Sequence, residues 1–173
     1  MSIYLTSDWH FCHDRDFIYK PRGFASVQEM NEAIVKRFNE VVREDDICYV
    51  LGDLMLNDDA EGMRLLAQLN GRLRIIRGNH DTSARLGLYL TLPNVESIEN
   101  AAYLQHGKYN FYLSHYPTLT TNFEDDKKLW QRVLNLHGHT HSPVPLQEMR
   151  YNVAVDAHNC YPVNIEEIIK AMK

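Results

Sequence analysis

Five short clusters of aspartate, asparagine and histidine each follow a run of residues that is typical of a β-strand. In chain order they are Asp8-Trp9-His10, Gly52-Asp53, Gly78-Asn79-His80-Asp81, Ser114-His115 and Gly138-His139-Thr140-His141. In open α/β sheets the loops beyond the strand ends gather at one edge, so side chains from distant segments can converge there. Imidazole together with carboxylate suits divalent zinc, iron, manganese or nickel. The pattern therefore predicts a metal site at the strand ends.

The number of candidate ligands predicts two metal ions rather than one. Seven ligands exceed what a single ion normally takes, but they are enough for two ions if one carboxylate bridges them. We assign the bridge to Asp53. The seven are Asp8, His10, Asp53, Asn79, His115, His139 and His141.

The order of these clusters resembles the calcineurin-like metallophosphoesterases, in particular the small single-domain members of bacteria and phages. The resemblance rests on Asp-x-His, Gly-Asp, Gly-Asn-His-Asp, a single histidine and Gly-His-x-His in this order, from Asp8 to His141. Residues 152–156 and 161–163 also look like the tail of the small members.

The resemblance implies a role for each residue of the clusters. It gives the leaving-group proton to His80, and Asp81 would bond the other imidazole nitrogen of His80 and fix its tautomer. One ion would be held by Asp8, His10, Asp53 and His141, and the second by Asp53, Asn79, His115 and His139.

The expected activity is hydrolysis of a phosphoester at a two-metal site, where the ions acidify a shared water and stabilise the charge of the transferred phosphoryl group. Manganese is the leading metal, with iron, nickel, zinc and magnesium as alternatives. A phosphodiesterase acting on small or nucleotidic substrates is favoured, because the chain has little room for a substrate-selecting cap. The alternatives are a phosphomonoesterase, a DNA-end nuclease and a non-catalytic scaffold of the same fold.

The loop after the first cluster holds candidates for contacts with the substrate. His13 and Arg15 are the two candidate substrate-binding residues. Arg15 belongs to a small basic group with Lys20 and Arg22, for which a solvated loop is the favoured interpretation. In the same segment, Trp9 is expected to be buried and Cys12 to be an inert, packed thiol. Structural roles are assigned to the remaining histidines, His106, His137 and His158.

Length and composition limit the class of protein. A chain of 173 residues with 45% hydrophobic residues fits a single domain, residues 1–173. The net charge of −5 comes without a basic stripe, so we expect no strong non-specific binding of nucleic acid. No apolar run approaches the length of a membrane span, and no signal peptide is recognisable. Three cysteines form no disulfide framework, so a cytoplasmic location is expected. The oligomeric state stays open.

Short apolar runs alternate with helical patterns, which is typical of layered α/β proteins. Strands are expected at residues 3–6, 47–51, 73–77 and 151–155, and a hairpin at 102–105 and 111–114. Helices are expected after Ser26, with Glu29 completing a capping box, at 59–69, at 127–133 and after Asn164. We infer two facing mixed sheets flanked by helices, a four-layer α/β/β/α sandwich.

Overall fold

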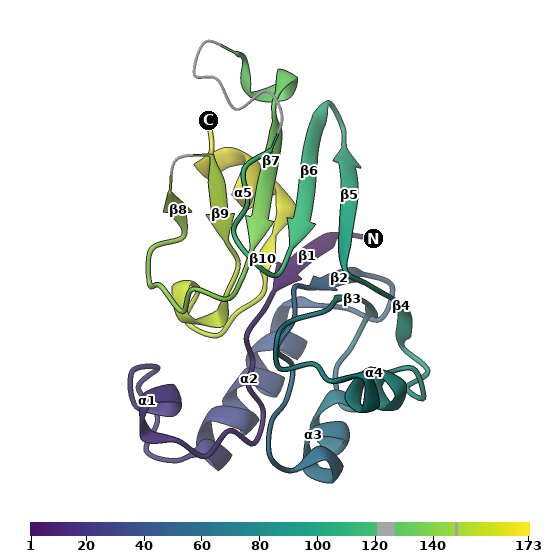
Figure 1. The fold of residues 1–173 in the computed structure, drawn as a ribbon, viewed down its shortest axis with the longest axis vertical. Coiled ribbons are helices and arrows are strands. Elements are labelled where there is room, and N and C mark those ends of the chain that lie inside the picture. The colour runs from purple at the N-terminus through teal and green to yellow at the C-terminus, as the bar shows by residue number, and fades with distance from the viewer. Residues whose placement is uncertain (121–126, 148) are drawn as a thin grey trace.

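Two five-stranded mixed sheets organise the computed structural model, which describes residues 1–120, 127–147 and 149–173. The first sheet has the order β10-β1-β2-β3-β4 and the second the order β5-β6-β7-β9-β8. In Figure 1 the second sheet fills the upper part of the molecule and the helices α1 to α4 fill the lower part. The predicted α/β class with two mixed sheets is confirmed.

The first sheet is parallel except at one edge. β1 (Ile3–Thr6), β2 (Ile47–Val50), β3 (Arg72–Ile76) and β4 (Val95–Glu99) run in one direction, and β10 (Val163–Asn164) is antiparallel to β1. β2 is buried along its whole length, as expected for a parallel strand covered on both faces.

Four helices alternate with the strands of this sheet. They are α1 (Asp16–Tyr19), α2 (Val27–Val41), α3 (Asp59–Leu66) and α4 (Ser83–Tyr89). In α2 the buried side chains recur at helical spacing, and Met30, Ile34 and Phe38 join a core cluster with Val50 and Ile75 from the sheet.

The second sheet contains three parallel strands with an antiparallel strand at each edge. β6 (Tyr109–Ser114), β7 (Val133–His137) and β9 (Arg150–Asn152) are parallel, and β5 (Ala101–His106) and β8 (Leu146–Gln147) form the edges. A second core cluster joins the two sheets. Its members include Leu5 and Leu51 from the first sheet side, Phe111 and Leu136 from the second, and Ile168 of α5 (Ile165–Ala171).

Several elements differ from the prediction. The helix predicted at 127–133 is replaced by the 3-10 turn Leu129–Gln131, after which Val133 begins β7; residues 121–126 lie outside the described part. The helix predicted at 59–69 ends at Leu66. Ser26 caps α2 as predicted, with Oγ accepting from Glu29 N at 3.2 Å, but the Glu29 carboxylate accepts from Ala25 N. The strand predicted at 151–155 ends at Asn152, and Val155 begins a 3-10 turn. The short helices α1 and α4 and the strands β4, β8 and β10 were not predicted.

No helix within the described ranges is both long enough and apolar enough to cross a membrane.

Candidate metal centre

All five predicted clusters lie directly after strands, at the ends where parallel strands finish together. Asp8 and His10 follow β1, Asp53 follows β2, and Asn79 follows β3; these three strands are parallel neighbours. In the second sheet, the last clusters follow β6 and β7, which are also parallel neighbours. Because parallel strands end at the same edge, the loops of both sheets meet between them (Figure 1). The structure brings all seven predicted ligands together there.

A first donor set converges from Asp8, His10 and His141. The Nε2 atoms of His10 and His141 are 3.1 Å apart. Asp8 Oδ1 lies 3.9 Å from His10 Nε2 and 3.7 Å from His141 Nε2. Asp53 Oδ2 is 3.7 Å from His10 Nε2, so it faces the same point.

A second donor set converges from Asn79, His115 and His139. Asn79 Oδ1 lies 2.8 Å from His115 Nε2 and 3.0 Å from His139 Nδ1. Asp53 Oδ2 is 3.5 Å from His115 Nε2. The same carboxylate oxygen of Asp53 therefore faces both donor sets, which is the position that the bridging assignment requires.

Each of the two carboxylates has one oxygen held by the protein and one turned toward the imidazoles. Asp8 Oδ2 accepts hydrogen bonds from Ser7 Oγ at 2.6 Å and from the amide of His139 at 2.9 Å. Asp53 Oδ1 accepts from the amide of His80 at 2.8 Å. Because these bonds fix the carboxylate planes, Asp8 Oδ1 and Asp53 Oδ2 are left to face the donor sets.

The backbone at the site adopts an uncommon conformation. Five of the seven candidate ligands have positive φ, which for residues other than glycine costs on the order of 1–3 kcal/mol each. Their φ values are 59° at Asp8, 51° at His10, 57° at Asp53, 68° at His139 and 48° at His141. Unfavourable backbone is tolerated where it places functional side chains, and its concentration here identifies the strand ends as a site.

Burial shifts the pKa of Asp8 and of His10 in the first donor set, whereas the pKa of His141 is raised because its contacts with Asp156 and Asp8 together outweigh the effect of burial. Burial raises the pKa of the Asp8 carboxyl and lowers the pKa of His10 well below its ordinary value, an effect that the neighbouring His141 increases. An imidazole kept neutral retains the lone pair that a metal ion needs.

Unsatisfied polar atoms show that a cation fits the donors present. Asp8 Oδ1, which faces the imidazoles, is buried and has no hydrogen-bond partner among the described residues. A buried polar atom without a partner is costly, and two facing imidazole nitrogens cannot both be satisfied by each other unless one carries a proton. Nitrogen and oxygen donors without a thiolate suit a hard-to-borderline divalent ion.

His80 lies beside both donor sets and is more open to solvent. Its Nε2 is 4.0 Å from Asp53 Oδ2, and its side chain is 42% exposed. The ring meets that of His10 edge to face, with 5.4 Å between centroids. This position suits a group that exchanges protons with a bound molecule.

Asp81 corrects one prediction. Its carboxylate was expected to bond the His80 imidazole, but it instead accepts from the amides of Asp53 at 2.8 Å, Gly78 at 2.9 Å and Leu54 at 3.2 Å. Tyr89 Oη donates to it as well, at 3.0 Å. The side chain points into the protein because three amides of the tight loops need an acceptor there. Asp81 therefore fixes the loop that carries Asp53 and not the tautomer of His80.

The candidate substrate residues lie on one side of the site. The His13 ring is 5.5 Å from the His10 ring, and its buried Nδ1 has no partner in the described part of the chain. Arg15 is exposed two residues further on. Trp9 is buried, as predicted. Cys12 is buried too, and burial raises the pKa of its thiol to about 11, so the prediction of an inert thiol agrees with its environment.

Two residues that support the carboxylates were missed in the sequence. Ser7 directly precedes the first cluster, and a hydroxyl next to a candidate ligand was a visible signal. Tyr89 lies on α4, far from any cluster, and nothing in the sequence connects it to Asp81.

Comparison with known proteins gives a consistent result. The sequence model of the calcineurin-like phosphoesterase superfamily domain matches residues 1–159. An uncharacterized protein of Methanocaldococcus jannaschii is 35% identical over 99% of this chain and 91% of its own length. A solved protein of unknown function from Aquifex aeolicus superposes with a TM-score of 0.73 at 24% identity, covering 98% of each chain. A solved archaeal phosphodiesterase superposes with a TM-score of 0.54 at 16% identity, covering 89% of this chain and 82% of its own.

Proposed function

The chain belongs to the calcineurin-like phosphoesterase superfamily, and from this premise we propose that it is a hydrolase that cleaves phosphodiesters at a pair of divalent metal ions. The observation that supports the proposal most strongly is the position of Asp53 Oδ2, 3.7 Å from His10 Nε2 of one donor set and 3.5 Å from His115 Nε2 of the other. One carboxylate oxygen shared by two donor sets is the arrangement of a bridged binuclear centre.

We assign Asp8, His10, Asp53 and His141 to one ion and Asp53, Asn79, His115 and His139 to the other. When bound, such ions supply a hydroxide nucleophile at neutral pH and neutralise charge on the phosphoryl oxygens. The protein fixes the donors through the loop bonds of Asp8, Asp53 and Asp81. His80 would donate its proton to the departing oxygen, and its exposure allows that proton to be replaced from solvent.

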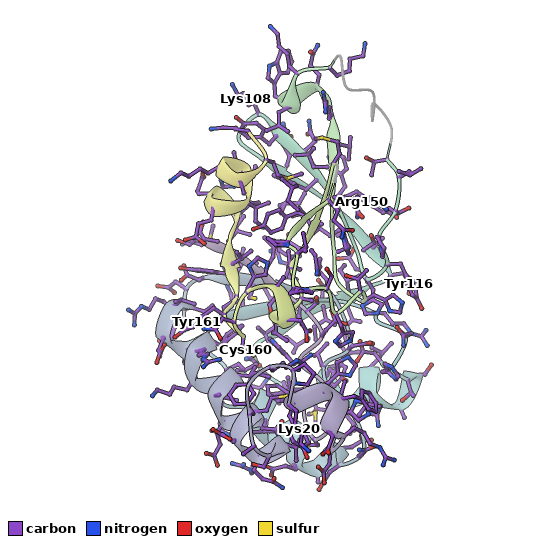
Figure 2. All side chains as sticks on the ribbon, turned by 90° about the vertical axis from the view of Figure 1, so that its left-hand side faces the viewer. Lys20, Lys108, Tyr116, Arg150, Cys160 and Tyr161 are labelled. Atoms are coloured by element: carbon purple, nitrogen blue, oxygen red, sulfur yellow. The ribbon has the colours of Figure 1, made fainter. Side chains whose placement is uncertain are left out.

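A diester substrate is favoured by the space beside the second donor set. A cavity of about 660 Å³ adjoins Asn79 and His115 and is also lined by Arg77, Tyr112 and Tyr116. Figure 2 shows Tyr116 at the edge of the molecule below the strands of the second sheet, and its side chain is 52% exposed. Two tyrosines and a guanidinium would accommodate the second ester group of a small or nucleotidic diester, which a monoester lacks.

We propose manganese as the working metal and the cytoplasm as the compartment. Nitrogen and oxygen donors in a mixed set suit manganese, although the same donors also accept iron, nickel, zinc or magnesium. All three cysteines are buried free thiols, as expected in a reducing compartment.

The test is a comparison of substrates after metal reconstitution. Protein stripped with a chelator and reloaded with Mn²⁺ should bind about two equivalents and hydrolyse bis(p-nitrophenyl) phosphate with a higher kcat/KM than p-nitrophenyl phosphate. The reverse order of kcat/KM would make the protein a phosphomonoesterase, and cleavage confined to DNA ends would make it a nuclease. Saturation at one equivalent, or no hydrolysis of any ester, would overturn the binuclear proposal.

A further inference from the structure

A buried arginine lies directly behind the first donor set. Arg22 belongs to the segment between α1 and α2, and its side chain is only 2% exposed, in contrast to the solvated loop predicted for it. Its guanidinium forms a two-pronged pair with Asp156, with Nε to Oδ1 and Nη2 to Oδ2 both at 2.9 Å. Asp156 lies in the 3-10 turn Val155–Ala157 near the end of the chain, so the pair joins segments that are 134 residues apart.

The same guanidinium also holds the loop of the first cluster. Arg22 Nη2 donates to the carbonyl of Asp8 at 2.9 Å, and Nη1 donates to the carbonyl of Trp9 at 3.0 Å. These carbonyls belong to the stretch in which Asp8 and His10 have positive φ. One side chain thus supplies two backbone hydrogen bonds that keep an unfavourable conformation in place.

Asp156 in turn holds the imidazole of His141. Its Oδ2 lies 3.1 Å from His141 Nδ1, the nitrogen on the far side of the ring from the donor set. A carboxylate at Nδ1 favours the tautomer that carries its proton there and leaves the lone pair on Nε2, and Asp156 lies closer to Nδ1 than the competing donor Arg22 Nη2, which is 3.5 Å away. That Nε2 atom is the one that faces His10 Nε2 at 3.1 Å.

We propose that Arg22 and Asp156 act as one positioning unit for the first metal ion. Arg22 fixes the backbone that presents Asp8 and His10, and Asp156 fixes the ring and the tautomer of His141. This inference rests on the proposed function, because it concerns the ion that Asp8, His10 and His141 would hold.

Charge explains why both members of the unit are needed. An unpaired guanidinium so close to the donors would repel a divalent cation, and the carboxylate of Asp156 cancels that charge. A lysine could carry the charge at position 22 but could not reproduce the fork that meets a carboxylate and two carbonyls at once. A buried ion pair is by itself weak evidence for stability, since apolar replacements are often as stable. The pair is better explained by what it positions.

Within the described residues, the second donor set has no guanidinium–carboxylate pair of this kind. Its charged supports are single carboxylates that accept backbone bonds, from the His139 amide to Asp8 and from the Gly78 amide to Asp81. His115 Nδ1 bonds the backbone carbonyl of Leu51 at 2.8 Å, and both Asn79 and His139 are exposed. Loss of the Arg22–Asp156 unit should therefore weaken one ion and spare the other.

The first experiment is a Mn²⁺ titration of the full chain, followed by the electron paramagnetic resonance signal of free Mn²⁺. Asp156→Asn and Arg22→Lys should each weaken one of the two binding events on the order of 10- to 100-fold, as for other partners of metal ligands. The second event should change by less than about threefold. Asp46→Asn is the matched control, since Asp46 is also buried and accepts amide bonds, from Ser2 and Arg43, at the opposite end of β2. Its Mn²⁺ affinities should equal those of the wild type.

Two further readouts separate positioning from stability and from the proposed function. The melting temperature of the metal-free variants should match that of Asp46→Asn within a few degrees; a much larger loss would reduce the pair to a structural role. In metal-free wild type, long-range ¹⁵N–¹H correlation spectra should show the proton of His141 on Nδ1. Finding it on Nε2, or finding both Mn²⁺ affinities unchanged in both variants, would overturn the inference. Failure of the wild type to bind a second ion would instead overturn the binuclear centre and leave the tautomer result as the test of Asp156.

Discussion

The two donor sets differ in what supports them. The first set, Asp8, His10 and His141, is backed by the buried side chains of Arg22 and Asp156. The second set, Asn79, His115 and His139, depends on single contacts, such as the bond between His115 Nδ1 and the Leu51 carbonyl at 2.8 Å and the bond from the His139 amide to Asp8 Oδ2 at 2.9 Å. Side chains that are held on several sides lose less freedom when they bind a ligand, so the first set is the more preorganised.

This difference suggests a division of labour. The preorganised set would retain its ion more tightly, whereas the set beside the cavity of Arg77, Tyr112 and Tyr116 would be open to the proposed substrate. Asp53 is the candidate ligand that we assign to both sets, and His80 lies beside both without being assigned to either. Substitutions at Asp53, at His80, at two glycines and at the substrate side of the site would test this difference between the sets.

Asp53→Asn should abolish the distinction between the sets by removing the charge that they share. We expect loss of both Mn²⁺ equivalents and a fall in kcat of at least about 1,000-fold, because a neutral amide cannot bridge two cations. Elemental analysis after dialysis and steady-state kinetics give the two numbers. Asp45→Asn, on the exposed turn before β2, should behave as wild type. An active Asp53→Asn enzyme with both ions would move the bridge to another residue.

His80→Ala should keep both metal equivalents and lose rate. Hydrolysis of a diester with an alkoxide leaving group should slow by about 100-fold or more, the usual range for general acid catalysis. A nitrophenolate leaves without a proton, so an aryl ester should suffer less.

The control for His80 is His106→Ala. His106 bonds Glu166 of α5 at 2.6 Å in an exposed contact, so its loss should leave both rates unchanged. Equal losses on both substrates in His80→Ala would point to electrostatic stabilisation, and loss of a metal equivalent would make His80 a ligand.

Two glycine substitutions should affect the Mn²⁺ affinities of the two donor sets differently, because each adds a methyl group beside a different carboxylate. A Cβ at Gly78 would clash with Asp53 Oδ1 and lie 2.5 Å from Asp53 N, whereas a Cβ at Gly138 would clash with Asp8 Oδ2 and lie 2.8 Å from Ser7 Cβ. Overpacking of this kind costs typically about 1–3 kcal/mol of unfolding free energy. Gly78→Ala should weaken both Mn²⁺ sites through Asp53. Gly138→Ala should weaken the first site through Asp8 and the second to a smaller degree, because the same clash disturbs the bond from the His139 amide to Asp8 Oδ2. Denaturant unfolding and Mn²⁺ titration measure these effects.

The control for both is Gly87→Ala in α4, where an added Cβ meets nothing within 4 Å. It should be neutral or stabilise the helix by roughly 0.5–1 kcal/mol. Equal Mn²⁺ affinities in Gly78→Ala and Gly138→Ala would contradict the assignment of Asp53 to both sets.

The sequence predicted that the seven candidate ligands lie close together, but not which other side chains hold them in place. The seven ligands could be found because each follows a strand-like run, and parallel strands must end at one edge. Arg22 could not, since arginine in a polar loop is usually solvated and its partner lies 134 residues away. Asp81 was assigned to the correct cluster, but the hydrogen-bond partners of its carboxylate were not predicted. Those partners are buried amides that lack another acceptor, and the packing of the loops determines which amides these are.

The same limit explains the missed elements of the fold. The start of α2 could be predicted because its capping residue, Ser26, is adjacent to the helix in the sequence. β4 is an edge strand with no fully buried residue, so the sequence of Val95–Glu99 has little alternation to detect. The helical pattern of residues 127–133 gives only the 3-10 turn Leu129–Gln131, because Val133 pairs with β6 instead of continuing a helix. That pairing is a long-range contact, so the local sequence pattern could not predict it.

The smallest expected effects concern the substrate side of the site, where His13 and Arg15 differ in how closely they approach the donors. The His13 ring lies 5.5 Å from the His10 ring and has a buried nitrogen without a partner in the described chain, so it is placed to bond a phosphoryl oxygen. One such bond contributes about 0.5–1.5 kcal/mol, which predicts a KM for the aryl diester raised roughly 2- to 10-fold in His13→Ala with kcat little changed.

Arg15 is exposed, and solvent screens its charge, so Arg15→Ala should raise KM by about twofold or less. Adding salt should remove the Arg15 effect and leave most of the His13 effect, because screening acts on exposed charges and not on a short hydrogen bond. If Arg15→Ala instead had the larger, salt-resistant effect, Arg15 would contact the substrate directly, and the loop after β1 would close over the first donor set when substrate binds.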